Sequence, residues 1–189
     1  MSKEVKFVIG KTAENRAAKA ADRSAAKLVT NVTKTTQAGI RAAVSTALRE
    51  GTPEYDAARA IVGMIGLSAP QTQAAWKYRE QLINNGLSME KVNEKFDKYA
   101  DELLQDRADT IARYEVMDAL NEGKDDAWEE AQRQGYLSEN ATIEWIATAG
   151  SCDDCDDYDG TTVPLGDEFP EGGPPLHPRC RCTTAIGTP

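Results

Sequence analysis

Every cysteine of this 189-residue chain, and its only histidine, lies between residues 152 and 182. The spacing is Cys-x-x-Cys, then twenty-one residues, then His-x-x-Cys-x-Cys, which gives five candidate metal ligands: Cys152, Cys155, His177, Cys180 and Cys182. Two cysteines separated by two residues can turn both thiolates toward one ion, and tetrahedral zinc takes four such sulfur or nitrogen ligands. The loop between the motifs is full of turn-forming residues, and a loop of this length needs something other than an apolar core to fix its shape. The spacing therefore predicts a zinc ion that joins the two segments.

Five candidate ligands exceed the four that tetrahedral zinc takes, and the spacing leaves the set open. Cys180 and Cys182 share a face if the backbone is extended, whereas His177 and Cys180 share a side if it turns. We expect Cys152 and Cys155 to bind with two of the other three, and the fifth group to lie beside the site as a hydrogen-bonding neighbour. The predicted role is structural, because zinc binding in small peptides contributes about 10–16 kcal/mol, as much as a typical domain's stability of about 5–15 kcal/mol.

Other uses of these cysteines fit the sequence less well. Disulfides are disfavoured because the N-terminus lacks a secretion signal, so the thiols should stay reduced. A redox Cys-x-x-Cys needs a lowered thiol pKa, whereas the four aspartates around Cys152 and Cys155 should raise it. The motif orders of zinc deaminases and zinc proteases are absent, since the single histidine follows the Cys-x-x-Cys. No Gly-rich phosphate loop is present either, and we expect the chain not to be an enzyme.

Upstream of the cysteines, from about Ala13 to Leu137, apolar residues return every three or four positions, which predicts helices. The first expected helices are one over 13–29, one ending at Gly51, one begun by Thr52 and Pro53, and one begun by a Ser68–Gln71 capping box. A long helix or two collinear ones should follow from Ser88 to the "NEG" at 121–123, and then a short helix around 127–131 that ends at Gly135. Alternation at Ile143, Trp145 and Ala147 then predicts a strand.

These patterns predict a mainly α fold: a helical body followed by a small zinc-stabilised β-rich C-terminal module. The expected domains are a basic N-terminal helical segment (1–52), the helical body (53–138) and the β/loop zinc-binding module (139–189). No apolar run is long enough to span a bilayer, so we expect a cytosolic protein without membrane contact.

Charge is distributed unevenly along the chain. The whole sequence has a net charge of −9, yet residues 1–50 carry ten Lys or Arg against four Asp or Glu, a local balance of +6. Residues 152–182 hold eight acidic side chains against two arginines, a balance of −6 that would repel phosphate. A DNA-reading zinc finger is therefore disfavoured at the cysteine cluster.

Two stretches, "EWIATAGSCDDCDDYDGTTVPLGDEF" and "PPLHPRCRCTT", resemble the C-terminal signature of phage minor head proteins, the Mu F-like head morphogenesis family. Upstream, "IGLSAPQTQAAWKYREQLINNGLS" and "DRADTIARYEVMDALNEGKDDAWEEAQRQGYL" are similar to the helical region that precedes this signature, so the resemblance covers about Tyr55 to Thr184. It places the family's cysteine and histidine positions on the five candidate ligands. The chain departs from the family at Tyr114, where the family tends to have threonine.

The resemblance implies a structural minor head protein in few copies at the portal vertex of a tailed bacteriophage, which acts in head morphogenesis and in DNA packaging or delivery. The implied partners are the portal protein and the major capsid protein, and the implied location is the virion after assembly in the host cytoplasm. The basic helix bearing Arg16, Lys19, Arg23 and Lys27 would contact acidic portal surface or packaged DNA, or stay solvated. The alternative function is a cytosolic zinc-dependent nucleic-acid-binding protein.

Overall fold

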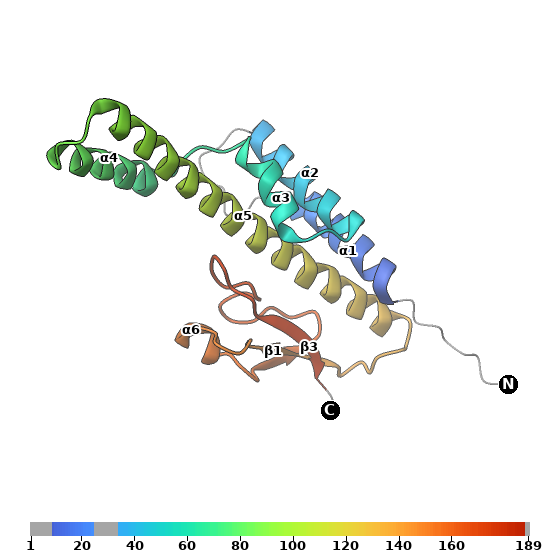
Figure 1. Cartoon of the computed structure of the whole chain (residues 1–189). Coiled ribbons are helices and arrows are strands. Elements are labelled where there is room, and N and C mark those ends of the chain that lie inside the picture. The colour runs from blue at the N-terminus through green and yellow to red at the C-terminus, as the bar shows by residue number, and fades with distance from the viewer. Residues whose placement is uncertain (1–8, 25–33, 188–189) are drawn as a thin grey trace.

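The computed structural model describes residues 9–24 and 34–187 of the chain. Its elements are α1 (Ile9–Ser24), α2 (Lys34–Glu50), α3 (Glu54–Val62), α4 (Ala69–Asn84), α5 (Met89–Arg133), β1 (Thr142–Ile146), α6 (Asp153–Asp156), β2 (Thr162–Pro164) and β3 (Thr183–Gly187). The long helix α5 runs through the molecule, with α1–α3 along one side and the small sheet along another (Figure 1). The prediction of a mainly helical fold with a small sheet near the C-terminus is thereby confirmed. None of the helices in the described ranges has both the length and the apolar character that a bilayer span requires.

Helix α5 is a single helix of 45 residues, so the prediction of a separate short helix around 127–131 is wrong. The "NEG" at 121–123, which suggested a helix end, lies inside α5. Gly123 is helical and packs against the backbone of Ala17 in α1, where a side chain would have no room. The helix ends instead before Gly135, whose φ of 75° is the left-handed conformation that glycine adopts readily.

The core of the helical part is formed where α2 packs against α1 and α3, and where all three pack against α5. Within residues 15–23 of α1, the side chains that reach the core are small, namely the buried alanines 17, 18, 20 and 21. The larger buried residues come from the neighbouring helices, among them Ile40, Val44 and Ile61. The predicted helix over 13–29 is described up to Ser24, and its remaining residues lie outside the described ranges.

Helices α4 and α5 begin after the predicted capping residues, and α3 begins one residue later than predicted. The Ser68–Gln71 capping box is present, and the Ser68 backbone N–H donates to Gln71 Oε1 at 3.0 Å. Ser88 precedes α5 as predicted. The cap of α3 is Pro53 rather than Thr52, because the proline keeps an extended ψ of 155° and the helix begins one residue later.

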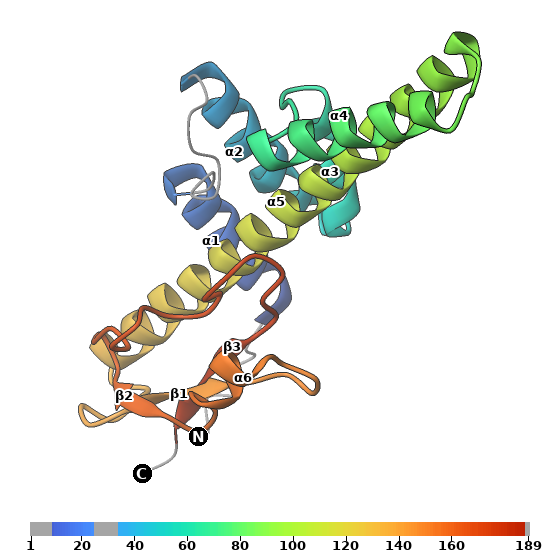
Figure 2. The same cartoon turned by 90° about the vertical axis from the view of Figure 1, so that its left-hand side faces the viewer.

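The three strands form an antiparallel sheet in the order β2-β1-β3, so the predicted strand at residues 143–147 is the central one (Figure 2). Ile143 and Trp145 point into the core as the alternation predicted, while Ala147 lies just beyond the end of β1. The ring of Trp145 packs against Tyr158 and Phe169, with centroids 5.3 and 5.5 Å away. The sheet and its loops thus have a small core of their own.

Polar contacts join β3 to α5, and the burial of Asp125 among them makes stability depend on pH. Thr184 Oγ1 donates to Asp125 Oδ1 at 3.4 Å, and Lys124 Nζ donates to the Thr184 carbonyl at 2.9 Å. Burial raises the pKa of Asp125 from 3.8 to about 6. A carboxyl whose pKa is raised by folding favours the folded state at low pH and loses this contribution as pH rises from about 4 to 6.

The side chain of the Asp125→Asn variant is neutral at every pH. We therefore expect the free energy of unfolding of this variant, relative to that of the unchanged chain, to be higher at pH 7.5 than at pH 4.5. The expected gain is on the order of 1 kcal/mol, since Lys124 and solvent screen part of the charge. Urea unfolding of both proteins at the two pH values measures it. The exposed Asp97→Asn serves as the control, and an equal effect of Asp125→Asn at both pH values would contradict the assignment.

Candidate metal centre

The Cys-x-x-Cys motif is shaped by the one-turn helix α6. Cys152 is its N-cap residue and Cys155 lies inside it. The backbone N–H groups of Cys155 and Asp156 both donate to the Cys152 carbonyl at 3.0 Å, which closes a tight turn. The second motif approaches from the loop that leads into β3, where the Cys180 N–H donates to the His177 carbonyl at 3.0 Å. Two short turns thus present the two groups of donors.

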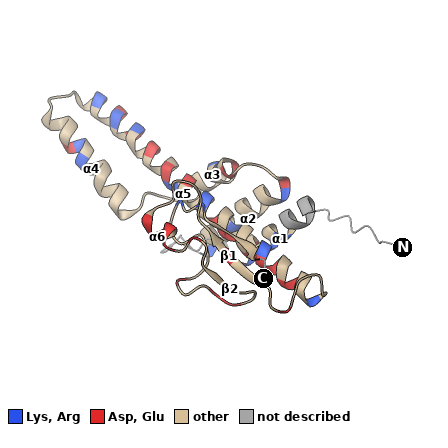
Figure 3. Cartoon of the chain, turned by 90° about the horizontal axis from the view of Figure 1, so that it is seen from below, with Lys and Arg blue, Asp and Glu red and all other residues tan. Residues whose placement is uncertain are grey.

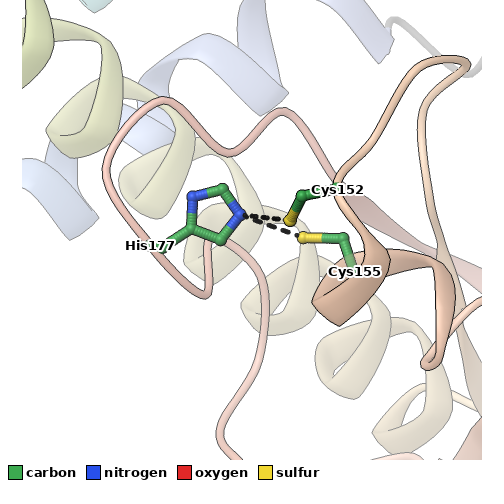
Figure 4. A group of neighbouring side chains, drawn as sticks. All are labelled: Cys152, Cys155 and His177. Atoms are coloured by element: carbon green, nitrogen blue, oxygen red, sulfur yellow. Dashed lines mark hydrogen bonds between the residues drawn. The ribbon is translucent and has the colours of Figure 1, made fainter.

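All five predicted ligands come together, with Cys155 at the centre of the cluster. His177 Nε2 lies 3.1 Å from Cys152 Sγ and 3.2 Å from Cys155 Sγ (Figure 4). On its other side, Cys155 Sγ lies 3.7 Å from Cys180 Sγ, and the Sγ atoms of Cys155, Cys180 and Cys182 are within 4.8 Å of one another. These are two groups of three donors that share Cys155, and either group could hold a metal ion. All four cysteines are free thiols.

The donor types, and the distance between two of the sulfurs, match those of a thiolate and imidazole zinc site. Zinc–sulfur bonds of about 2.3 Å in a tetrahedron give sulfur–sulfur edges of about 3.8 Å, close to the 3.7 Å between Cys155 and Cys180. His177 Nδ1 lies 2.8 Å from the Pro178 carbonyl, which can only accept, so Nδ1 carries the proton. In the neutral ring Nε2 then keeps its lone pair, and this lone pair faces the thiols.

The thiols differ in burial and in pKa. The backbone N–H of Cys155 lowers the pKa of Cys152, so the expectation that neighbouring aspartates raise it is wrong for this residue. Burial raises the pKa of Cys155, and the adjacent thiols of Cys182 and Cys180 raise it further. For Cys180, burial acts in the same upward direction, but hydrogen bonds from backbone amides outweigh it and the pKa is lowered. A bound cation would favour the thiolate form at every one of these sulfurs.

Little solvent reaches the inner part of the cluster. Cys155, Cys180 and Cys182 are 1%, 2% and 1% exposed, whereas Cys152 lies at the surface. The three buried sulfurs belong to the same core as Trp145 and Phe169. Metal binding and the packing of the sheet therefore depend on the same residues.

Two contacts that hold this loop against α5 are not signalled by the sequence. Asn121, in the supposed helix end, donates from Nδ2 to the Pro174 carbonyl at 2.7 Å. Arg179, between two candidate ligands, has a φ of 67°, and its side chain contacts Asp106 and donates to Thr110 Oγ1 at 3.1 Å. A motif spacing describes the ligands but not these long-range partners.

The basic residues predicted to form a binding face on α1 are turned partly toward acidic residues of the same chain. Arg23 donates to Glu122 at 3.1 Å and to Asp126 at 2.7 Å. Arg16 donates to the Asp126 carbonyl at 3.3 Å. Lys27 lies outside the described ranges. Part of the positive charge of α1 is therefore compensated within the molecule.

Comparison with known families gives a match for the part of the chain that includes this site. The family model described as phage Mu protein F like protein matches residues 79–185, from within α4 to within β3. Neither the search of curated proteins nor the search of solved structures gives a match. The matched range covers more than half of the chain and includes all five candidate ligands. The chain therefore belongs to the phage Mu protein F like family.

Proposed function

We propose that the chain is a structural minor head protein at the portal vertex of a tailed bacteriophage, with a role in head morphogenesis and in DNA packaging or delivery. The observation that carries the proposal is the family match over residues 79–185, since membership of this family suggests a phage head morphogenesis protein. The proposed location is the virion, after assembly in the host cytoplasm. The proposed partners are the portal protein and the major capsid protein.

Within this function, the cysteine cluster is a structural zinc site that fixes the C-terminal module. The thiolate and imidazole donors are those that zinc prefers, and three of them lie in the core of the sheet. The proposed ligands are Cys152, Cys155, His177 and Cys180, because His177 Nε2 lies 3.1 and 3.2 Å from the two Cys-x-x-Cys thiols and Cys180 Sγ lies 3.7 Å from Cys155 Sγ. Cys182 is then the neighbouring fifth group. A non-catalytic role is supported by the position of the only histidine inside the cluster.

The alternative, a nucleic-acid-binding protein, has less support from the molecule. Its candidate basic face is on α1, where Arg23 is paired with two acids of α5 and Arg49 of α2 is paired with Asp22. A protein that neutralises phosphates needs cations that are free to replace counterions. The function of this chain is therefore expected to depend more on contacts with other proteins than on contacts with DNA.

Binding to the portal protein of the same phage tests the proposal directly. We expect the purified, zinc-loaded chain to sediment with portal rings, and to stay bound at about 0.5 M NaCl, where surface ion pairs are screened. Duplex DNA added to the same assay provides the comparison. Absence of portal binding together with a salt-dependent shift of the DNA would replace this function by the alternative.

A further inference from the structure

Helix α4 and residues 89–105 of α5 form a two-helix arm that extends beyond the rest of the molecule (Figures 1 and 2). The seam between the two helices buries Ala75, Leu82 and Val92 and pairs Tyr78 with Tyr99, whose ring centroids are 4.7 Å apart. Among the described elements, α4 packs extensively only against α5. The arm therefore has one internal interface, and its other faces meet solvent.

One side of the arm carries large apolar side chains along the edge of the seam. On α4 these are Trp76 and Ile83, and on α5 they are Met89 and Phe96. Each pair is seven residues apart, which places its members on one face of a helix. The rings of Trp76 and Phe96 are 5.3 Å apart, so the two pairs share one side of the arm. Trp76, Ile83 and Met89 are 53%, 41% and 51% exposed, which makes this the apolar side of the arm.

The charges on α5 indicate which kind of partner can bind the apolar side. Acidic residues recur at spacings of four, three and four, at Glu90, Glu94, Asp97 and Asp101, and form one row. Lysines at 91, 95 and 98 form a second row, and Figure 3 shows Lys or Arg bands on α5 near the tip of the arm. At 3.6 residues per turn, Glu90 and Asp97 follow the apolar pair of α5 on the side away from the seam, so these two acids border the apolar side. Glu94 and Asp101 lie opposite the seam.

A second copy of the chain does not fit this surface well. When two arms pair antiparallel about a two-fold axis that crosses their helices, the acidic edge of one meets the acidic edge of the other, and like charges at such positions oppose association. A helix with basic residues along one edge would instead find opposite charges there. A third helix on a two-helix hairpin also has the packing geometry of a small bundle.

We propose that the apolar side of the arm binds an amphipathic α-helix of another protein, with apolar residues at helical spacing and Lys or Arg along one edge. Trp76 and Phe96 form the centre of the site, and Ile83 and Met89 extend it toward the tip. The guanidinium of Arg79 lies over the Trp76 ring, 5.7 Å from its centroid, and the incoming helix packs beside this pair. This binding site is independent of the metal centre and goes beyond the proposed function.

Two synthetic helical peptides about as long as α4 test the proposal with the full chain. They share the same leucine face and differ only in having Lys or Glu along one edge. We expect the Lys peptide to bind and the Glu peptide to bind about tenfold more weakly, with a blue shift of Trp76 emission. The double variant I83Q/M89Q should bind the Lys peptide about tenfold more weakly, because both side chains are exposed and contribute to this surface.

Charge reversal on α5 provides the second part of the experiment. The variant E90K/D97K should bind the Glu peptide more tightly than the Lys peptide. The variant K91Q/K95Q, in the lysine row, should still bind the Lys peptide more tightly. Circular dichroism confirms that each variant is folded. Equal binding of both peptides, or unchanged binding to I83Q/M89Q, overturns the proposal. A concentration-dependent dimer in sedimentation that I83Q/M89Q abolishes also overturns it, in favour of a second copy as the occupant.

Discussion

Cys155→Ser is expected to abolish the proposed zinc binding and to unfold the C-terminal module while the helices α1–α5 stay folded. Cys155 is the donor shared by both groups of the cluster and is itself part of the module's core. Zinc binding of about 10–16 kcal/mol exceeds what such a small apolar core can supply alone. Metal analysis should fall from one zinc per chain to none. Limited proteolysis should then cut after residue 139, and the signal of the buried Trp145 should shift to that of an exposed indole.

Chelation of the unchanged protein should reproduce these effects, and Asp153→Asn, at an exposed neighbour of the thiols, should not. Single variants then identify the ligand set. Cys180→Ser and His177→Gln should lose the ion, whereas Cys182→Ser should keep it at one per chain. Retention by His177→Gln with loss by Cys182→Ser would show a four-cysteine site. Reduced protein without stoichiometric metal and with a protease-resistant C-terminus would refute the structural zinc site altogether.

The sequence predicted that the cysteines and the histidine meet, because residues at Cys-x-x-Cys spacing can converge on one point within a single turn. It could not predict which four bind. Cys180 and Cys182 are two residues apart and both lie within 4.8 Å of Cys155, so spacing alone does not separate them. The contact of Arg179 with Asp106 and Thr110 could not be predicted from the sequence either, since it joins residues about seventy positions apart.

Among the helices, periodicity located the elements, but glycine was misleading at one position. Gly123 and Gly135 both follow a helical pattern, and a helix end is predicted at each. Gly135 does follow the end of a helix, and glycine suits this position because its φ is positive. Gly123 lies inside a helix, and glycine is needed there because α1 approaches closely enough to exclude a side chain. A sequence does not distinguish these two uses of glycine when the partner helix is a hundred residues away.

Gly123→Ala is therefore expected to destabilise the helical part, although alanine is the better helix former by about 1 kcal/mol. The added Cβ would lie 2.6 Å from the backbone N and 2.8 Å from the Cα of Ala17. No rotamer change relieves a clash with backbone, so α1 must move away and loosen the packing of its four buried alanines. We expect a net loss on the order of 3 kcal/mol in urea unfolding, since overpacking costs about 1–3 kcal/mol and more where backbone shifts.

Gly39→Ala is the matched control, because its Cβ would also meet an atom at 2.6 Å, but that atom is Sδ of the exposed Met64 side chain. A flexible thioether can move aside, and the helix propensity of alanine in α2 should then make this variant neutral or slightly more stable. Ala17→Gly should not rescue Gly123→Ala, since the clashing atoms belong to the backbone of residue 17. Equal stability changes for Gly39→Ala and Gly123→Ala, or full rescue by Ala17→Gly, would show that α1 does not pack on α5 through this glycine.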